Sequence, residues 1–191
     1  MKGRTVATGL SEFHEYVRQI VKVASWVLPT AAITPIVVSF VDLNPPWPNR
    51  IGLTAVTCAA VLFTVIAVFQ LLDSRRRRTV NLTVSAALVI GAVLAVVYFV
   101  LFAFLVFKPE GSTAFVKGLQ CTSDALLLHS AACPWLDDPE LRSVAFNEWR
   151  LWTAPSIYVA RIVLMLVWIA MFIAFATCLG AFVRHQAQLQ R

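Results

Sequence analysis

The residues best suited to covalent chemistry in this sequence are four cysteines. Cys121 and Cys133 lie in one extramembrane segment and would enclose a loop of about a dozen residues, which a disulfide can close. A disulfide forms in an oxidising compartment, whereas two free thiols are the alternative in a reducing one. We therefore expect a bond between Cys121 and Cys133 if this segment lies outside the cell. Cys58 and Cys178 fall within apolar runs, where cysteine usually serves as a small packing residue.

Ionisable residues inside apolar runs mark transport or catalytic sites in membranes. No Asp, Glu, Lys or His falls near the middle of an apolar run here, and Arg161 lies a turn or two inside the start of a helix. Its long side chain can extend to the membrane interface. Alternatively, it faces the interior of the helix bundle or an oligomer axis and pairs with an acidic residue, where it could set anion preference or hold a closed state. The candidate partners are Asp42, Asp137, Asp138 and Glu148. Arg161 is thus the candidate pore or charge site.

Motifs of catalysis and metal binding are absent from the sequence. It contains no Gly-rich phosphate loop, no His-Glu-x-x-His, no Cys-x-x-Cys and no Gly-x-Ser-x-Gly. Three histidines and scattered cysteines give no zinc-ligand spacing. We therefore expect no catalytic residue, no metal and no cofactor.

The composition is that of a membrane protein. Of the 191 residues, 59% are hydrophobic and 14% charged, whereas soluble domains are about half apolar and a quarter charged. The mean hydropathy is +0.76. Four spans of about 20 residues would occupy half of the chain and leave no separate soluble catalytic domain. The net charge of +6 is explained by membrane topology, so we expect no nucleic acid partner.

Four apolar runs are long enough to cross a bilayer, namely 23–41, 51–72, 80–107 and 162–183. The first contains Pro29 and Pro35, and we expect a kinked helix because each proline removes a backbone donor. The sequence therefore predicts an all-α polytopic membrane protein. Its four transmembrane helices form a bundle, with a small external helical loop domain.

The orientation follows from four consecutive arginines in a short loop. Arg75, Arg76, Arg77 and Arg78 lie between the second and third runs, and such loops are retained in the cytoplasm. The same arginines could contact anionic lipid head groups or an acidic partner. Both termini are then cytoplasmic. Abundant Ala and Val, and Arg in excess over Lys, suggest a GC-rich bacterial source, hence the plasma (inner) membrane.

The chain is expected to divide into nine parts. In order, these are an amphipathic cytoplasmic helix 1–22, the first span 23–41, a short outer loop 42–50, the second span 51–72, a basic cytoplasmic loop 73–79, the third span 80–107, an outer helical lid 108–161, the fourth span 162–183 and a cytoplasmic tail 184–191.

The predicted lid contains signals of local structure. Asp138, Pro139 and Glu140 supply an N-cap, a first-turn proline and a first-turn acid, which predicts a helix from there towards Trp152. A second short helix is expected over 123–133. An aromatic belt at the outer boundary is expected from Trp47, Trp135, Trp149, Trp152 and Tyr158. Within the spans, small residues spaced by four predict close helix packing, namely Ala55 and Ala59, then Ala87, Gly91 and Ala95, and finally Ala170, Ala174 and Cys178.

Two membrane families share this layout. Four spans, inside termini and a larger second outer loop with cysteines resemble the tetraspanins, but their Cys-Cys-Gly signature is missing here. The layout is also similar to the disulfide-bond-forming quinone reductases, whose second-loop cysteine pair Cys121 and Cys133 would match. That resemblance implies thiol–quinone oxidoreductase activity. Those enzymes also need a Cys-x-x-Cys in the first outer loop, and 42–50 contains no cysteine.

The expected function is therefore assembly without catalysis. The protein would act as a homo-oligomeric pore or membrane-perturbing effector, or as an accessory subunit of a membrane complex. Its expected partners are membrane lipids with further copies of itself or other membrane subunits. The thiol–quinone oxidoreductase is the alternative.

Overall fold

The fold is mostly helical and has three long apolar helices. A computed structural model of the chain describes residues 35–38, 43–48, 50–72, 77–108, 114–129, 132–136, 141–142 and 147–189. Three helices within them are long and apolar enough to cross a membrane, namely α2 (Arg50–Leu71), α3 (Arg77–Leu105) and α7 (Ala154–Leu189). Apolar helices at the second, third and fourth predicted spans are thereby confirmed.

Most of the predicted first span lies outside the described residues. This holds for Pro29 and for the expected helix over 1–22. Residues 35–38 are helical, and Pro35 among them is fully buried. The loop at 43–48 lies against α3, since the Tyr98 hydroxyl donates a hydrogen bond to the Leu43 carbonyl oxygen at 2.5 Å.

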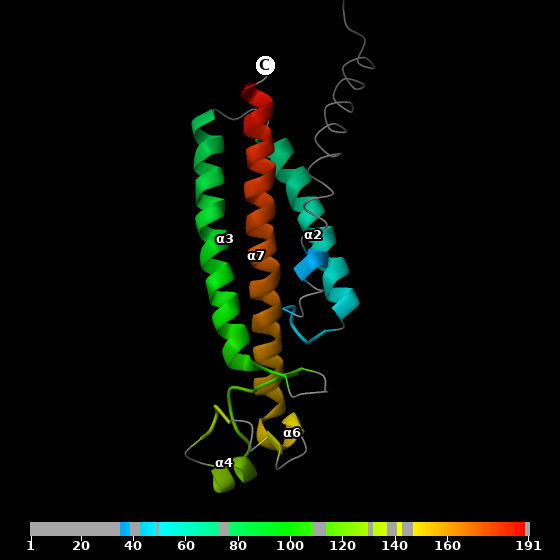
Figure 1. Cartoon of the computed structure of the whole chain (residues 1–191), viewed down its shortest axis with the longest axis vertical. Coiled ribbons are helices and arrows are strands. Elements are labelled where there is room, and N and C mark those ends of the chain that lie inside the picture. Colours follow the sequence, from blue (N-terminus) through cyan, green and yellow to red (C-terminus); the bar gives the residue numbers. More distant parts are fainter. Residues whose placement is uncertain are drawn as a thin grey trace, which may run out of the picture.

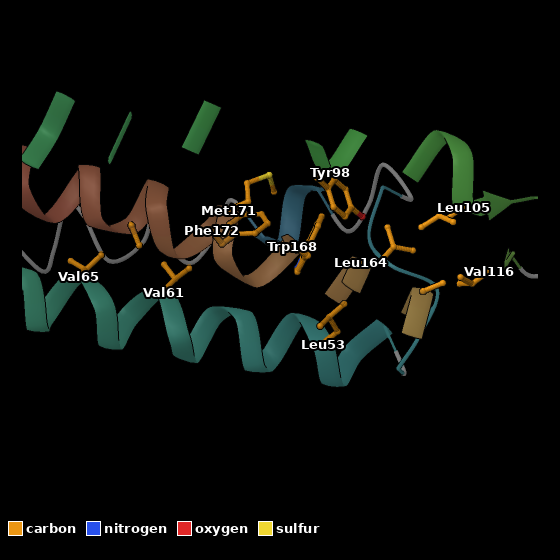
Figure 2. Close-up of a cluster of buried hydrophobic side chains, with 12 residues drawn as sticks. Leu53, Val61, Val65, Tyr98, Leu105, Val116, Leu164, Trp168, Met171 and Phe172 are labelled. Carbon is orange, nitrogen blue, oxygen red and sulfur yellow. The ribbon is translucent and has the colours of Figure 1, made fainter. Parts of the chain in front are cut away.

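The three helices are arranged with α7 in the middle. Figure 1 shows α7 between α2 and α3, and it packs against both of them. The buried contacts form one apolar cluster that takes Leu53 from α2, Tyr98 from α3 and Trp168 from α7 (Figure 2). The outward faces are apolar as well, as with Phe63, which is 75% exposed. A helix that is hydrophobic all round is suited to lipid rather than to water.

Aromatic rings and one polar contact hold this cluster together. The rings of Tyr98 and Trp168 lie 5.2 Å apart, and those of Trp168 and Phe172 lie 4.8 Å apart. The Trp168 indole donates to the hydroxyl of Thr57, which is completely buried on α2. Polar contacts between membrane helices of this kind contribute about 0.6 kcal/mol on average. The contact also fixes the register of α7 against α2.

Close helix contacts occur where small residues were predicted to pack. A Cβ added to Gly91 would lie 3.1 Å from the Phe175 ring of α7, and one added to Gly180 would lie 3.2 Å from the Val65 carbonyl oxygen of α2. Ala87 and Ala174 are both buried. By contrast, Ala55 and Ala59, the predicted strip on α2, are exposed and contact no other described helix closely. The strip on α3 therefore faces α7, whereas Gly180, which makes the close contact with α2, was not part of a predicted strip.

The third span ends earlier than predicted, and a small sheet follows it. Helix α3 ends at Leu105, and strand β1 (Val106–Phe107) pairs antiparallel with β2 (Phe115–Val116). This two-stranded ladder departs from the all-α prediction. Valine and phenylalanine favour such pairing, and the pairing satisfies backbone groups where the helix stops.

Helix α7 extends beyond the predicted fourth span at both ends. It begins at Ala154, inside the predicted lid 108–161, and runs to Leu189, inside the predicted tail 184–191. Pro155 lies in its first turn, where backbone N–H groups have no partner within the helix, so the N–H that proline lacks is not needed. The lid thus comprises residues 106–153.

The lid lies at one end of the molecule. Figure 1 shows its short helices α4 (Ser123–His129) and α6 (Glu148–Leu151) at the end opposite to the start of α3 and the end of α7. The predicted helix over 123–133 is confirmed as far as His129. A continuous helix towards Trp152 is wrong, because Asn147 has an extended backbone and its side chain caps α6 by accepting from the Trp149 N–H.

The lid has a hydrophobic core of its own. Its buried members are Cys121, Ala125, Leu136, Leu141, Leu151, Trp152 and Ile157. Ile157 belongs to the first turn of α7, so the helix completes the core of the lid. Trp152 is 1% exposed and donates from its indole to the Pro134 carbonyl oxygen at 3.0 Å. It is a core residue and not the belt residue that the sequence suggested.

Two arginines bracket the apolar part of α7. Arg161 and Arg184 are separated by a run without charges, and the helical rise puts about 34 Å between them. The hydrocarbon layer of a bilayer is about 30 Å thick, so each arginine can reach one interface. The Arg184 guanidinium lies 5.4 Å from the ring centre of Phe69 on α2.

Candidate functional site

The candidate site is the junction between the lid and α7, and an ion pair lies at its centre. Arg161, about two turns into α7, donates from Nη2 to Oε1 of Glu148 on α6. Only 13% of the Arg161 side chain and 8% of the Glu148 side chain are exposed. Glu148 was one of four acidic partners considered from the sequence.

The local structure explains why these two residues meet. Asn147 starts α6, and Trp152 ends it with an extended backbone. The chain then turns at Thr153 into α7. The single turn of α6 therefore lies beside the second turn of α7. The Trp152 N–H closes α6 by donating to the Glu148 carbonyl oxygen. This corner places Glu148 next to a residue thirteen positions further along the chain.

Two aromatic rings cover the ion pair. The Arg161 guanidinium carbon lies 5.5 Å from the ring centre of Trp149 and 6.0 Å from that of Tyr158. The two rings are 5.8 Å apart, and both side chains are nearly half exposed. Such cation–π contacts contribute about 0.5 to 2 kcal/mol, more when the cation is desolvated. The rings keep water away from the charges while they remain at the surface themselves.

The ion pair is not fully satisfied. Glu148 Oε2 and Arg161 Nε are buried and have no hydrogen-bond partner among the described residues. Removing two charges from water costs several kcal/mol, which a single contact offsets only in part. The pair therefore holds the lid against α7 less strongly than a well-packed apolar contact would.

Arg161 does not present an unpaired charge. Its guanidinium is paired with Glu148 within the same chain and lies within 6.0 Å of the ring centres of Trp149 from the lid and Tyr158 from α7. An arginine that sets the ion preference of a pore needs its charge directed at the pore axis. The geometry favours the lid-to-helix role of Arg161 over the pore role.

The predicted cysteine pair is brought together. The sulfur atoms of Cys121 and Cys133 lie 2.08 Å apart, which is disulfide distance. Cys121 also forms an antiparallel β-bridge with Trp152, so the pair lies next to the corner that joins α6 to α7.

Sequence reasoning missed the residues that attach the lid to α7. The Thr153 N–H donates to the Gln120 carbonyl oxygen at 2.9 Å, and the Ser156 hydroxyl donates to the same oxygen at 3.2 Å. Gly118 lies so close that an added Cβ would be 2.5 Å from both Ser156 Oγ and Trp152 Cβ. No local pattern marks these residues, because their partners lie more than thirty positions away in the chain.

Several other predicted sites are only partly described. Arg75 and Arg76 lie outside the described residues, whereas Arg77 and Arg78 begin α3. In the described part of the chain no group of His, Cys, Asp and Glu could hold a metal ion.

The two other cysteines do not supply a second thiol pair next to the cysteine pair of the lid. Cys58 on α2 and Cys178 on α7 are not part of a disulfide. By helical rise, Cys178 is about 25 Å further along α7 than Arg161, at the lid junction. This thiol is too far away to exchange with the Cys121–Cys133 pair.

Comparisons of the chain with protein-family models, curated proteins and solved structures find no match.

Proposed function

We propose that this protein acts by assembly rather than catalysis, as an accessory subunit of a membrane complex that it contacts through its lid. The observation that carries this proposal is the apolar surface of α4. Leu126, Leu127 and Leu128 are 48%, 85% and 77% exposed, although the lid buries a core of its own. Contiguous exposed apolar side chains on a folded domain are typical of protein or membrane contacts.

The position of α4 favours a protein over the bilayer. Figure 1 shows α4 at the far end of the lid, beyond the start of α7. Arg161, which can reach the interface, lies about 10 Å inside that start by helical rise. The leucines therefore stand beyond the head-group layer.

Charge indicates the kind of partner. Residues 108–153 contain six acidic and four basic side chains, in a chain whose net charge is +6. A second copy would bring a like-charged lid, whereas a basic surface around an apolar patch would complement it. The proposed partner is the extracytoplasmic part of another membrane chain with such a surface.

We place the lid outside the cell and both termini in the cytoplasm, in the plasma membrane of a bacterium. The arginine-rich loop 73–79 supports this orientation, since the start of α3 and the lid lie at opposite ends of the molecule (Figure 1). The cysteine pair supports it independently, because a disulfide persists in an oxidising compartment.

The alternatives predicted from the sequence have less support. An oligomeric pore would use Arg161 as an unpaired charge, and a thiol–quinone oxidoreductase would need a second thiol pair within exchange distance of Cys121 and Cys133. If bilayers containing the protein conduct, and Arg161→Ala changes the ion preference, the pore replaces the subunit proposal. Quinone reduction coupled to thiol oxidation, lost in Cys121→Ser, would instead establish the enzyme.

The test is site-specific photocrosslinking in intact cells. A photoreactive residue at Leu127 should give one discrete adduct with another membrane protein, which also co-purifies at fixed stoichiometry in mild detergent. The matched control is Leu88, which is exposed on the apolar surface of α3. A photoreactive residue at Leu88 should not give that adduct. Leu127→Asp with Leu128→Asp should abolish the adduct and leave the lid protease-resistant. Adducts with lipid or with this chain alone, at a native mass of this chain alone, would refute the proposal.

A further inference from the structure

We infer that residues 43–48 form a strap that Tyr98 holds among the long helices, and not the free outer loop that the sequence suggested. These six residues are neither helix nor strand. They are half-buried, and Pro45 among them is buried. The strap runs from a contact with α3 to the start of α2, so it joins the two helices that flank α7.

The first end of the strap is attached to α3. Tyr98 is 1% exposed, and its hydroxyl donates to the Leu43 carbonyl oxygen at 2.5 Å. The Tyr98 ring packs against that of Trp168 on α7, with 5.2 Å between the ring centres (Figure 2). The helix core therefore fixes the ring, and the ring presents its hydroxyl to the strap.

The attachment point lies inside the level at which α3 ends. Tyr98 comes seven residues before Leu105, the last residue of α3, which is about 10 Å by helical rise. A tyrosine side chain and one hydrogen bond together span less than this distance. The Leu43 carbonyl oxygen is therefore level with the last turns of α3 and not beyond them. Figure 1 shows residues 43–48, in cyan, level with the long helices and apart from the elements of the lid.

The other end of the strap leads directly into α2. Arg50 begins this helix two residues after Pro48. Within its first turns, α2 contributes Leu53 to the core cluster, and the Thr57 hydroxyl accepts from the Trp168 indole. The strap thus adds a direct connection between α2 and α3 at the outer end, where each helix also packs on α7. Its release would uncouple α2 from α3 there.

The composition of the strap suits a buried position. Irregular backbone at membrane depth is tolerated where protein covers it, because unpaired polar groups have no water to bind. Proline has no N–H, so Pro45, Pro46 and Pro48 present no backbone donor that needs a partner. The Tyr98 hydroxyl supplies the donor for the Leu43 carbonyl oxygen. Loss of this donor should let the strap leave its position.

The test is the rate at which a membrane-impermeant maleimide labels a cysteine at Asn44, measured on the full-length protein in lipid nanodiscs. Cys58 and Cys178 are replaced by serine, so that the added thiol is the reporter. Asn44→Cys should react at least about tenfold more slowly than Ser123→Cys, which is exposed on the lid, because the strap must first open locally. Equal rates would overturn the strap, since they would place Asn44 in a free outer loop.

A second variant decides whether the Tyr98 hydroxyl holds the strap. Tyr98→Phe keeps the ring but leaves the Leu43 carbonyl oxygen without this donor, so the labelling rate of Asn44→Cys should rise at least about fivefold. The matched control is Tyr158→Phe, which removes a hydroxyl from a half-exposed tyrosine of α7 and should leave the rate unchanged. An unchanged rate in Tyr98→Phe would overturn the inference.

A buried reporter distinguishes release of the strap from loosening of all the helices. Ala160 on α7 is 0% exposed, and Ala160→Cys should stay unreactive when Tyr98 is replaced by phenylalanine. If Tyr98→Phe speeds labelling at Asn44 and at Ala160 alike, the hydroxyl stabilises the helices as a whole. That outcome would also overturn the strap.

Discussion

At the scale of single residues, Gly118 is the most constrained position of the lid. Its Cα lies against Ser156 and Trp152, and a methyl group would be placed 2.5 Å from atoms of both. Neither neighbour can withdraw easily, because Ser156 is hydrogen-bonded to Gln120 and Thr153, and Trp152 is fully buried. The contact therefore depends on the absence of a side chain.

Gly118→Ala should lower the free energy of unfolding of the lid by about 1 to 3 kcal/mol, the range for overpacking a tight site. The measurement is the rate of proteolysis of the lid as a function of temperature. Gly52→Ala is the matched control, since no atom lies within 4 Å of its added Cβ. Gly52 is in α2, so this change should be neutral or stabilising by up to about 1 kcal/mol. Equal effects of the two substitutions would contradict the crowding argument.

At the scale of elements, the contact between α2 and α7 depends on Gly180. An added Cβ would lie 3.2 Å from the Val65 carbonyl oxygen and 3.3 Å from the Val68 side chain. Membrane helices gain no hydrophobic driving force from each other, so close backbone approach is what stabilises their packing. A large side chain at this position has to push the two helices apart.

Gly180→Leu should therefore weaken the packing of α7 on α2 by about 1 to 3 kcal/mol. The readout is the yield of a crosslink between the two helices, followed during titration with a denaturing detergent. Ala92→Leu adds the same bulk on the exposed face of α3, and should leave the midpoint of that titration unchanged. A midpoint that falls equally in both variants would show that the added volume, and not the helix contact, is responsible.

The elements of this protein could be predicted to the extent that their signals are local. Apolar runs identified α2, α3 and α7, because uninterrupted hydrophobicity depends on neighbouring residues alone. The break at Asn147 was not recognised, because the apolar pattern continues across it, although asparagine followed by an acidic residue is a local N-cap signal. The choice of Glu148 as the partner of Arg161, and the need for glycine at 118, follow from contacts between distant parts of the chain.

At the scale of the whole molecule, the two ends have different chemistry. The lid and its cysteine pair lie at one end, and the start of α3 with the end of α7 lies at the other (Figure 1). The proposed orientation puts the lid outside the cell. Thiol labelling on each side of the membrane can test it.

A single cysteine at Ser123 should react with a membrane-impermeant maleimide in intact cells, and one at Thr79 should react only after the membrane is opened. Both side chains are exposed in the structure, so accessibility depends on the membrane alone. The background is Cys58→Ser with Cys178→Ser, which removes the two cysteines outside the Cys121–Cys133 pair. Labelling of Thr79→Cys in intact cells, with Ser123→Cys protected, would reverse the orientation.

The bridge between Cys121 and Trp152 also bears on how this chain can change over evolution. Because Cys121 and Trp152 meet, a two-residue Asn-Gly turn could join Gln120 to Thr153 and close the chain without residues 121–152. Segments with adjoining ends tolerate insertion and exchange. Residues 121–152 could then be exchanged without repacking the core between the long helices, to which they contribute no buried residue.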